Sequence, residues 1–437
     1  MALAGCGGST HRALPRRVAS ATEFVAGGTS TSAKTAPPKT APPKTAPPRV
    51  GPGLRALRAA LPAQLGPLGA GTGAYVYDIS AGRTLFAVRA TETRPPASVE
   101  KLFTSVAVLS DLGSGARLQT AILGTGHLGP GGIWHGNLYV RGGGDPTFGD
   151  GTFNRLWEDG YGPTANRLVA QLSAQGIRRV TGAVIGDASL FDSRRGGPNS
   201  GFAPDIPDLG GQLAALTYDH GSTTGRLSPV AFAVKELVLT MRGAHIAARA
   251  ARFTARTPPV AQQLASVSSP PMSVLLKLMD VPSDDFFAEM LTKQLGVQFG
   301  NGGTTAAGAA VISQAVAAYG LDPNVVDGSG LSRSDRTSPE QVVDLLRSLW
   351  QTPTGRVLDD SLPVVGVSGT VQTIAVNTAA QGRCIAKTGT LDDVTNLAGY
   401  CHARGGHVLA FALFVDGPPN WVAIPPIGQM VAAIAKY

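Results

Sequence analysis

Apolar residues recur along this chain with two spacings, one typical of helices and the other typical of strands. Helical spacing predicts helices near both ends of the folded part, over residues 54–65, 98–109, 274–279, 286–291, 303–318, 340–350 and 427–435. Alternation and short apolar runs predict strands beside them, over residues 73–78, 84–88, 386–390, 397–401 and 408–415. Helices and strands are therefore expected to mix at both ends of the chain.

The middle of the chain has a different character. Strands are expected there over residues 121–123, 137–141, 180–185, 231–240 and 245–250, with one helix over residues 166–175. This strand-rich stretch separates the first helices from the later ones, so the chain is divided into four parts. Residues 51–113 and 268–437 form one split domain, residues 114–267 an insert of one or two domains, and residues 1–50 a tail.

The tail is rich in small and polar residues and includes three copies of Lys-Thr-Ala-Pro-Pro. Such a segment is expected to be a disordered, extended linker. It also holds seven basic residues and one acidic residue, so most of the net charge of +8 belongs to it. The basic charge is therefore not expected to form a folded face for nucleic acid.

Two features of the sequence bear on export. Leu3-Ala4-Gly5-Cys6 matches the box at which bacterial lipoproteins are cut and then lipidated on the cysteine. A signal peptide needs a charged segment and an apolar segment ahead of that box, whereas no charged segment and almost no apolar segment precede it here. Either the match is due to chance or translation starts upstream, and we favour the upstream start. No run of 18 apolar residues occurs, so no transmembrane helix is expected.

Three short motifs follow one another in the split domain. Ser98-Val99-Glu100-Lys101 lies at the start of an expected helix, where positions i and i+3 share a face. A lysine that has lost its proton can there accept the proton of the serine hydroxyl and make the serine nucleophilic. Ser332-Arg333-Ser334 and Lys387-Thr388-Gly389 complete an order typical of penicillin-binding proteins and class A β-lactamases.

Longer segments extend this likeness. The chain resembles peptidase family S13, the low-molecular-mass class C penicillin-binding proteins that act as D-alanyl-D-alanine carboxypeptidases and endopeptidases. The resemblance covers residues 54–437 and is carried by Ser98–Thr104, Tyr139–Thr147, Gly186–Asp192, Ser283–Leu291, Asp327–Arg333 and Lys387–Leu391. It implies an α/β fold in which an antiparallel sheet packs between helices. A long β-rich insert after the first motif is itself a trait of that family.

The resemblance implies a role for each motif. Ser98 would attack the carbonyl between two D-alanines to give an acyl-enzyme, with Lys101 as the base. Ser332 would relay a proton to the leaving amine. Backbone N–H groups of Ser98 and Thr390 would form the oxyanion hole. The substrate and its terminal carboxylate would be bound by Ser334, Lys387, Thr388, Gly389 and Thr390.

Two positions depart from the family pattern. The second motif usually reads Ser-x-Asn, whereas Ser334 offers one short hydroxyl in place of the amide. Asp285 stands where relatives often carry Asn, and we expect it to fix the start of the following helix. The departure at Ser334 is the reason for an alternative hypothesis, in which this chain is a family relative with weak catalysis or none.

Cysteine and histidine positions bear on cross-links and metals. Cys384 and Cys401 would lie opposite each other in a hairpin that turns near Asp392-Asp393. They form either a disulfide, which an exported protein can keep, or a pair of small buried residues. The seven histidines show no metal-ligand spacing, so neither a metal nor a cofactor is expected.

The leading hypothesis is a serine D-Ala-D-Ala carboxypeptidase, with endopeptidase activity left open. The protein would be exported, would trim peptidoglycan stem peptides outside the cytoplasmic membrane, and would be acylated by β-lactams. It would contact the membrane only through a lipid on Cys6, and it would not bind nucleic acid. The alternative is a weak or inactive relative that binds peptidoglycan as a scaffold. A β-lactamase or esterase is disfavoured by the large insert and by the lack of a glutamate placed for deacylation.

Overall fold

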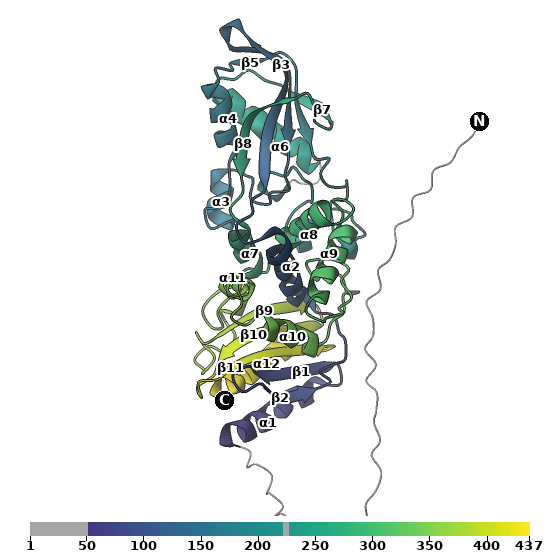
Figure 1. Cartoon of the computed structure of the whole chain (residues 1–437), viewed down its shortest axis with the longest axis vertical. Helices are drawn as coiled ribbons and strands as arrows, with labels where there is room; N and C mark the ends of the chain where they lie inside the picture. The colour runs from purple at the N-terminus through teal and green to yellow at the C-terminus, as the bar shows by residue number, and fades with distance from the viewer. Residues whose placement is uncertain (1–50, 222–226) are drawn as a thin grey trace, which may run out of the picture. The chain divides into compact units, whose positions relative to one another are not determined.

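Five strands drawn from both ends of the chain form one antiparallel sheet. The computed structural model describes residues 51–221 and 227–437. The sheet contains β1 (Thr72–Asp78), β2 (Arg83–Val88), β9 (Cys384–Leu391), β10 (Val394–His402) and β11 (Val408–Asp416). Its strand order is β2-β1-β11-β10-β9, so the first strand of the chain pairs with the last (Figure 1).

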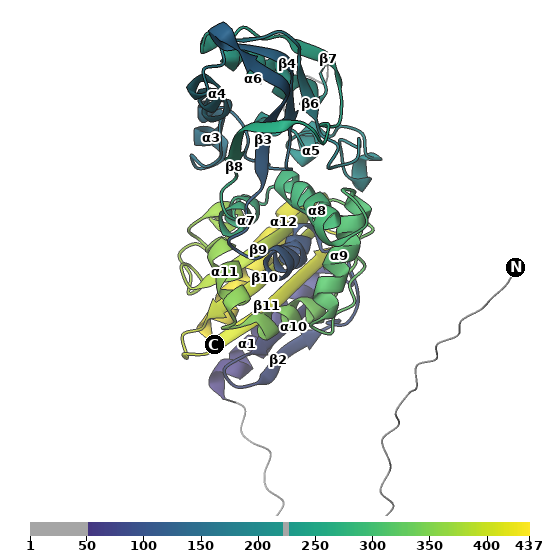
Figure 2. The same ribbon diagram turned by 45° about the horizontal axis from the view of Figure 1, so that its top comes forward.

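Helices cover both faces of this sheet because its inner strands are apolar on both sides. Along β11, Ala412 and Phe414 belong to one buried cluster, whereas Phe411 and Leu413 belong to another. The second cluster includes α1 (Pro52–Leu65) and α12 (Asn420–Lys436). The first cluster includes α2 (Lys101–Ala107), α7 (Met272–Asp280), α8 (Asp285–Phe299), α9 (Thr305–Ala317), α10 (Pro339–Leu349) and α11 (Pro353–Ser361). In Figure 2, α2 is the dark blue helix among these helices. The α/β arrangement expected from the sequence is confirmed.

A second sheet is formed by the middle of the chain. It contains β3 (Gln119–Gly129), β4 (Ile133–Arg141), β5 (Arg179–Val180), β6 (Val184–Asp187), β7 (Ala250–Thr254) and β8 (Gln262–Ser268). Its order is β7-β6-β4-β3-β8, and β5 also pairs with β4. Strands β4, β6 and β7 are parallel, and parallel strands need crossover connections. Helices in this part are α3 (Gly151–Trp157), α4 (Ala165–Ala174), α5 (Ile206–Leu209) and α6 (Pro229–Gly243).

The strand predicted over residues 231–240 is wrong, because this segment lies in helix α6. Its apolar run has no clear alternation, and such a run fits a buried strand or a buried helix equally well. Ser228 caps the helix by accepting a hydrogen bond from the backbone N–H of Ala231 at 3.2 Å, and Pro229 follows it at the first helical position. The strand predicted over residues 245–250 is displaced, since β7 begins only at the end of that range.

Side chains of α8 anchor the insert to the split domain. The ring of Phe286 stacks on that of His220, with 4.3 Å between the ring centroids. Farther along the helix, Nζ of Lys293 lies 2.5 Å from Oδ1 of Asp192. Because α8 begins beside the candidate motifs, the insert supports an element of the site.

The two cysteines lie on neighbouring strands of the first sheet. Cys384 on β9 and Cys401 on β10 are register partners, and a disulfide joins them with an S–S distance of 2.08 Å. The disulfide alternative is therefore confirmed. No helix within the described ranges is long and apolar enough to cross a membrane. Cys6 and the Lys-Thr-Ala-Pro-Pro repeats lie outside the described residues.

Candidate active site

Ser98 and Lys101 lie side by side at the entrance to α2. A 3-10 turn over Ala97–Glu100 precedes the helix, and Nζ of Lys101 lies 3.0 Å from Oγ of Ser98. The Lys101 side chain is completely buried. Ala97 has a φ of 47°, a left-handed conformation that residues other than glycine rarely adopt. Such strained backbone is concentrated at active sites, and here it lies directly before the candidate nucleophile.

Strands β9 and β10 hold this turn in place. Nδ2 of Asn396 donates hydrogen bonds to the carbonyl oxygens of Pro95 and Pro96, both at 2.9 Å. Gly389 on β9 packs so closely that a Cβ there would lie 2.3 Å from the carbonyl oxygen of Pro96. The glycine of the Lys-Thr-Gly motif therefore lets β9 approach the turn, which is a packing role.

A second lysine–serine pair lies next to the first. Nζ of Lys387 donates a hydrogen bond to Oγ of Ser283 at 2.6 Å. Ser283 lies in the turn between α7 and α8 and has a φ of 66°. Burial, with the nearby charge of Lys101, lowers the pKa of Lys387 to about 7. Lys387 can therefore gain or lose a proton near neutral pH.

Asp285 contacts the first lysine. Its Oδ1 lies 2.5 Å from Nζ of Lys101, and the carbonyl oxygen of Ser329 accepts a hydrogen bond from the same nitrogen at 2.7 Å. Asp284 caps α8 instead, because its Oδ1 accepts a hydrogen bond from the N–H of Phe287 at 2.8 Å. The prediction that Asp285 fixes the helix start is therefore wrong, and its carboxylate pairs with the lysine.

The loop that contains Ser332 folds onto itself. The Ser332 N–H donates to Asp327 at 2.8 Å, and its Oγ accepts from the N–H of Ser334 at 3.2 Å. Ser334 is exposed, and its carbonyl oxygen accepts from Asn324 at 2.7 Å. Within the described part of the chain, no hydrogen bond joins either serine to the two lysine–serine pairs. The structure thus places Ser283 where the sequence placed Ser332, and Ser334 does not take the place of the asparagine.

The second motif of the site is therefore Ser283-Asp284-Asp285. The signal for it is present in the sequence, because a Ser-x-Asp lies directly ahead of an apolar helix. It has the spacing of Ser-x-Asn, with a carboxylate in place of the amide. Sequence reasoning missed Ser283 and gave Asp285 the role of a helix start, because Ser332 offered a competing match in the expected order.

Buried carboxyl groups hold the loop behind Lys101. Asp327 accepts hydrogen bonds from two backbone N–H groups of the loop at 2.7 and 2.8 Å, and Glu289 accepts one from Ser329 at 3.1 Å. Burial raises the pKa of Glu289 to about 7, and burial with the charge of Asp327 raises the pKa of Asp335 to about 11. Burial also raises the pKa of Glu100 well above its usual value. Through their hydrogen bonds, Asp327 and Glu289 hold the loop whose Ser329 carbonyl contacts Lys101.

A cavity of about 260 Å³ opens beside the two lysine–serine pairs. Its lining includes Ser98, Ser283, Asp285, Thr370, Thr373, Thr388, Thr390 and Asn396. A neighbouring hollow of about 640 Å³ shares Asp285 and Thr390 and extends to Asp208 of the insert. No group of three or more His, Cys, Asp or Glu within residues 51–221 and 227–437 is arranged to hold a metal ion.

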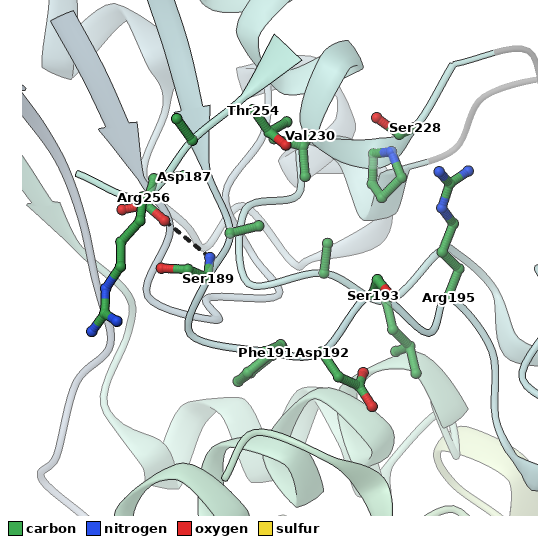
Figure 3. Close-up of a pocket in the computed structure, with 15 residues that line it drawn as sticks. Asp187, Ser189, Phe191, Asp192, Ser193, Arg195, Ser228, Val230, Thr254 and Arg256 are labelled. Carbon is green, nitrogen blue, oxygen red and sulfur yellow. Dashed lines mark hydrogen bonds between the residues drawn. The ribbon is translucent and has the colours of Figure 1, made fainter. Parts of the chain in front are cut away.

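A separate cavity of about 370 Å³ lies in the insert. It is bordered by residues at the ends of β6 and β7 and at the start of α6, and Figure 3 shows Arg195 and Arg256 on opposite sides of it. Asp187 on its wall accepts hydrogen bonds from the N–H groups of Ser189 and Thr257 at 3.0 and 2.7 Å. None of its lining residues belongs to the three motifs.

Comparison with known proteins identifies the family. The sequence profile of the D-Ala-D-Ala carboxypeptidase 3 (S13) family matches residues 57–232 and 209–436. The chain belongs to the S13 family. The family expected from the motifs is therefore confirmed, and as a member of it the chain is a serine-type D-Ala-D-Ala carboxypeptidase.

Similar proteins cover most of this S13 chain. It is 30% identical over 408 residues to carboxypeptidase DacB of Mycolicibacterium smegmatis, covering 87% of this chain and 84% of the relative. It is 27% identical over 455 residues to D-alanyl-D-alanine carboxypeptidase of Actinomadura sp. (strain R39), covering 84% and 82%. Penicillin-binding protein 4 of Haemophilus influenzae shares the fold, with a TM-score of 0.72 at 21% identity, over 86% of this chain and 99% of that chain. A complex of that protein with a β-lactam gives a TM-score of 0.67 at 20% identity, over 87% and 98% of the two chains.

Proposed function

We propose that Ser98 carries out the hydrolysis of the bond between two terminal D-alanine residues through an acyl-enzyme. One observation carries this assignment: Ser98 lines a cavity with its Oγ 3.0 Å from the buried Nζ of Lys101, and Ser283, the partner of Lys387, lines the same cavity. The two pairs supply a base for the attacking hydroxyl and an acid for the leaving amine.

Acylation begins when Oγ of Ser98 bonds to the D-alanine carbonyl carbon and its proton passes to Nζ of Lys101. The resulting oxyanion accepts hydrogen bonds from the backbone N–H groups of Ser98 and Thr390, which both line the cavity. The C–N bond breaks as Ser283 gives its hydroxyl proton to the leaving nitrogen. Lys387 then restores that hydroxyl across the 2.6 Å contact.

Recognition of the substrate needs a cation and hydroxyl donors for its free carboxylate. Lys387 supplies the positive charge, and Thr388 and Thr390 supply hydroxyl groups at the cavity wall. Gly389 contributes by letting β9 pack against the turn that carries Ser98. A C-terminal D-alanine has such a carboxylate next to the bond that is cut, so this set fits a carboxypeptidase.

Hydrolysis of the acyl-enzyme repeats the proton transfers with water as the nucleophile. Once Lys101 has given up the proton that it took from Ser98, it accepts one from the attacking water and passes it to Oγ of Ser98 as the acyl C–O bond breaks. A β-lactam offers the same combination of a reactive carbonyl and a carboxylate, so we expect it to acylate Ser98. The complex of the Haemophilus influenzae protein with a β-lactam supports this expectation through the shared fold.

We place the reaction outside the cytoplasmic membrane, on peptidoglycan stem peptides that end in D-Ala-D-Ala. The Cys384–Cys401 disulfide supports this location, because disulfides persist in oxidising compartments. A lipid on Cys6 would hold the protein at the membrane surface. Labelling the protein with a radioactive fatty acid in bacterial cells, with Cys6→Ala as the control, tests the anchor.

Covalent labelling with a fluorescent penicillin tests the nucleophile. The wild-type protein should form an adduct that is absent in Ser98→Ala. A pair of serine variants separates the two candidate relays: Ser283→Ala should slow D-alanine release from diacyl-Lys-D-Ala-D-Ala, whereas Ser332→Ala should leave it unchanged. An unlabelled wild-type protein that still binds peptidoglycan would favour the scaffold hypothesis instead.

A further inference from the structure

Lys101 is enclosed by three oxygen atoms, and only one of them can take a proton from it and keep it. Its nitrogen contacts Oγ of Ser98 at 3.0 Å, the carbonyl oxygen of Ser329 at 2.7 Å and Oδ1 of Asp285 at 2.5 Å. An ammonium group has three N–H donors and no lone pair, so it fills all three contacts and has nothing left to accept a proton. The neutral amine keeps two donors and turns one lone pair to the serine.

The path by which Lys101 becomes neutral is limited by its burial. Its side chain has no exposed surface, so bulk water cannot remove the proton directly. A backbone carbonyl such as that of Ser329 does not hold a proton at neutral pH, and the hydroxyl of Ser98 is the group to be activated. The carboxylate of Asp285 remains, and its side chain is 18% exposed and lines the cavity.

We propose that Asp285 is the proton acceptor that converts Lys101 from an ammonium group into a base. This inference rests on the proposed function, because it concerns the activation of the same nucleophile. It gives Asp285 a role that an asparagine at this position cannot perform, since an amide does not take up a proton near neutral pH.

The proton transfers balance through acylation. First an N–H bond of Lys101 breaks and an O–H bond of Asp285 forms, which leaves a neutral amine beside a neutral acid. Next the O–H bond of Ser98 breaks, its proton moves to Nζ of Lys101, and Oγ bonds to the carbonyl carbon. The leaving nitrogen takes its proton from Ser283, and Lys387 replaces that proton. Asp285 afterwards releases its own proton into the cavity that it lines.

Other charged groups surround the Lys101–Asp285 pair. Lys387 on β9 is a second buried lysine, and burial with the charge of Lys101 lowers its pKa to about 7. Carboxyl groups approach from α7, α8, the 3-10 turn and the loop behind Lys101, and they are those of Asp280, Asp284, Glu100 and Asp327. None of these four groups makes a hydrogen bond to the Lys101 nitrogen, so the direct exchange partner is Asp285.

The acylation rate as a function of pH distinguishes this role from a purely electrostatic one. A carboxylate that only stabilised the ammonium group would oppose catalysis, and its removal would speed acylation at low pH. A carboxylate that accepts the proton is needed for catalysis, so Asp285→Asn should slow penicillin acylation about a hundredfold across the pH range. Asp192→Asn is the matched control, because it removes the carboxylate of the other buried lysine–aspartate pair, that of Lys293 and Asp192, and should acylate at the wild-type rate.

Chemical rescue provides the second readout. Formate, a small carboxylate that fits the space left by the side chain, should restore acylation of Asp285→Ala in proportion to its concentration, and chloride should not. A wild-type rate in Asp285→Asn, or Asp285→Ala that stays slow with formate, would overturn the acceptor role. Adduct formation in Ser98→Ala would instead overturn the proposed function, so the two failures are distinguishable. Thermal unfolding of each variant identifies any loss of the fold.

Discussion

Two buried lysine–aspartate pairs in this protein have the same geometry and different surroundings. In each pair the nitrogen–oxygen distance is 2.5 Å; the side chains of Lys101 and Lys293 are 0% and 1% exposed, and those of Asp285 and Asp192 are 18% and 24% exposed. The first pair adjoins Ser98, whereas the second joins α8 to the insert.

The neighbours of each lysine account for the difference in role. Lys101 also contacts a serine hydroxyl at 3.0 Å, and it lies near enough to Lys387 for its charge to help lower the pKa of that second lysine. Lys293 has a backbone carbonyl, that of Arg194 at 3.4 Å, as its further contact. A buried ion pair by itself therefore indicates a structural anchor. A serine hydroxyl and a second lysine beside such a pair indicate a catalytic site.

Removing each lysine in turn should separate the two roles most strongly. Lys101→Met should lower kcat/KM for D-alanine release about a thousandfold, because the base of the reaction is lost. Lys293→Met should leave kcat/KM within about twofold of wild type. Steady-state kinetics on diacyl-Lys-D-Ala-D-Ala give both numbers. Comparable losses in the two variants would contradict the distinction.

Removing the aspartate of the anchor should instead reduce stability. Asp192→Asn leaves the buried charge of Lys293 without its partner, so the free energy of unfolding should fall by about 3 kcal/mol. The double variant Asp192→Asn/Lys293→Met removes both charges and should regain most of that loss. Urea unfolding measures each value. If the single and double variants were equally unstable, the pair would not be acting as an ion pair.

The lowered pKa of Lys387 predicts how activity depends on pH. Lys387 loses its charge as the pH rises through about 7, so KM for a peptide with a free carboxylate should rise about tenfold between pH 7 and 9. Lys387→Arg keeps its charge over this range, so its KM should stay level even if its rate is lower. A wild-type KM that did not change with pH would show that Lys387 remains charged.

The smallest effect is expected at Glu100, which is buried behind Lys101. Its folded-state pKa is well above 4.5, so it stabilises the fold at low pH, and this contribution is lost as the pH rises toward that folded-state pKa. Glu100→Gln does not titrate, so its stability relative to wild type should increase with pH while its activity stays the same. Thermal unfolding between pH 4 and 8 gives the comparison. A constant difference across this range would argue against a titrating Glu100.

Contacts between residues close in sequence were predictable from the sequence. Ser98 and Lys101 meet because positions three apart share a helical face, and the turn between the strands places Cys384 opposite Cys401. The fold class followed from the family segments. The helix α6 was mistaken for a strand because a continuous apolar run lacks a distinguishing period.

Contacts between distant residues were harder to predict. Ser283 meets Lys387 through the turn between α7 and α8, and no spacing in the sequence encodes that approach. The order of motifs was satisfied by Ser332 as well, so the order alone could not choose between the two serines. The structure distinguishes the two serines through Asp327. Its carboxylate accepts a hydrogen bond from the N–H of Ser332 and keeps that serine within its own loop.

The pairing of β1 with β11 determines when this enzyme can first become active during its synthesis. Ser98 and Lys101 are made early, but β1 and β2 alone form a two-stranded hairpin, which is marginally stable in water. The strand that completes the centre of the sheet is the last one made, and pairings between distant segments form slowly. A nascent or truncated chain therefore carries Ser98 without the lysine on β9, so we expect hydrolysis to start only once the whole chain has folded.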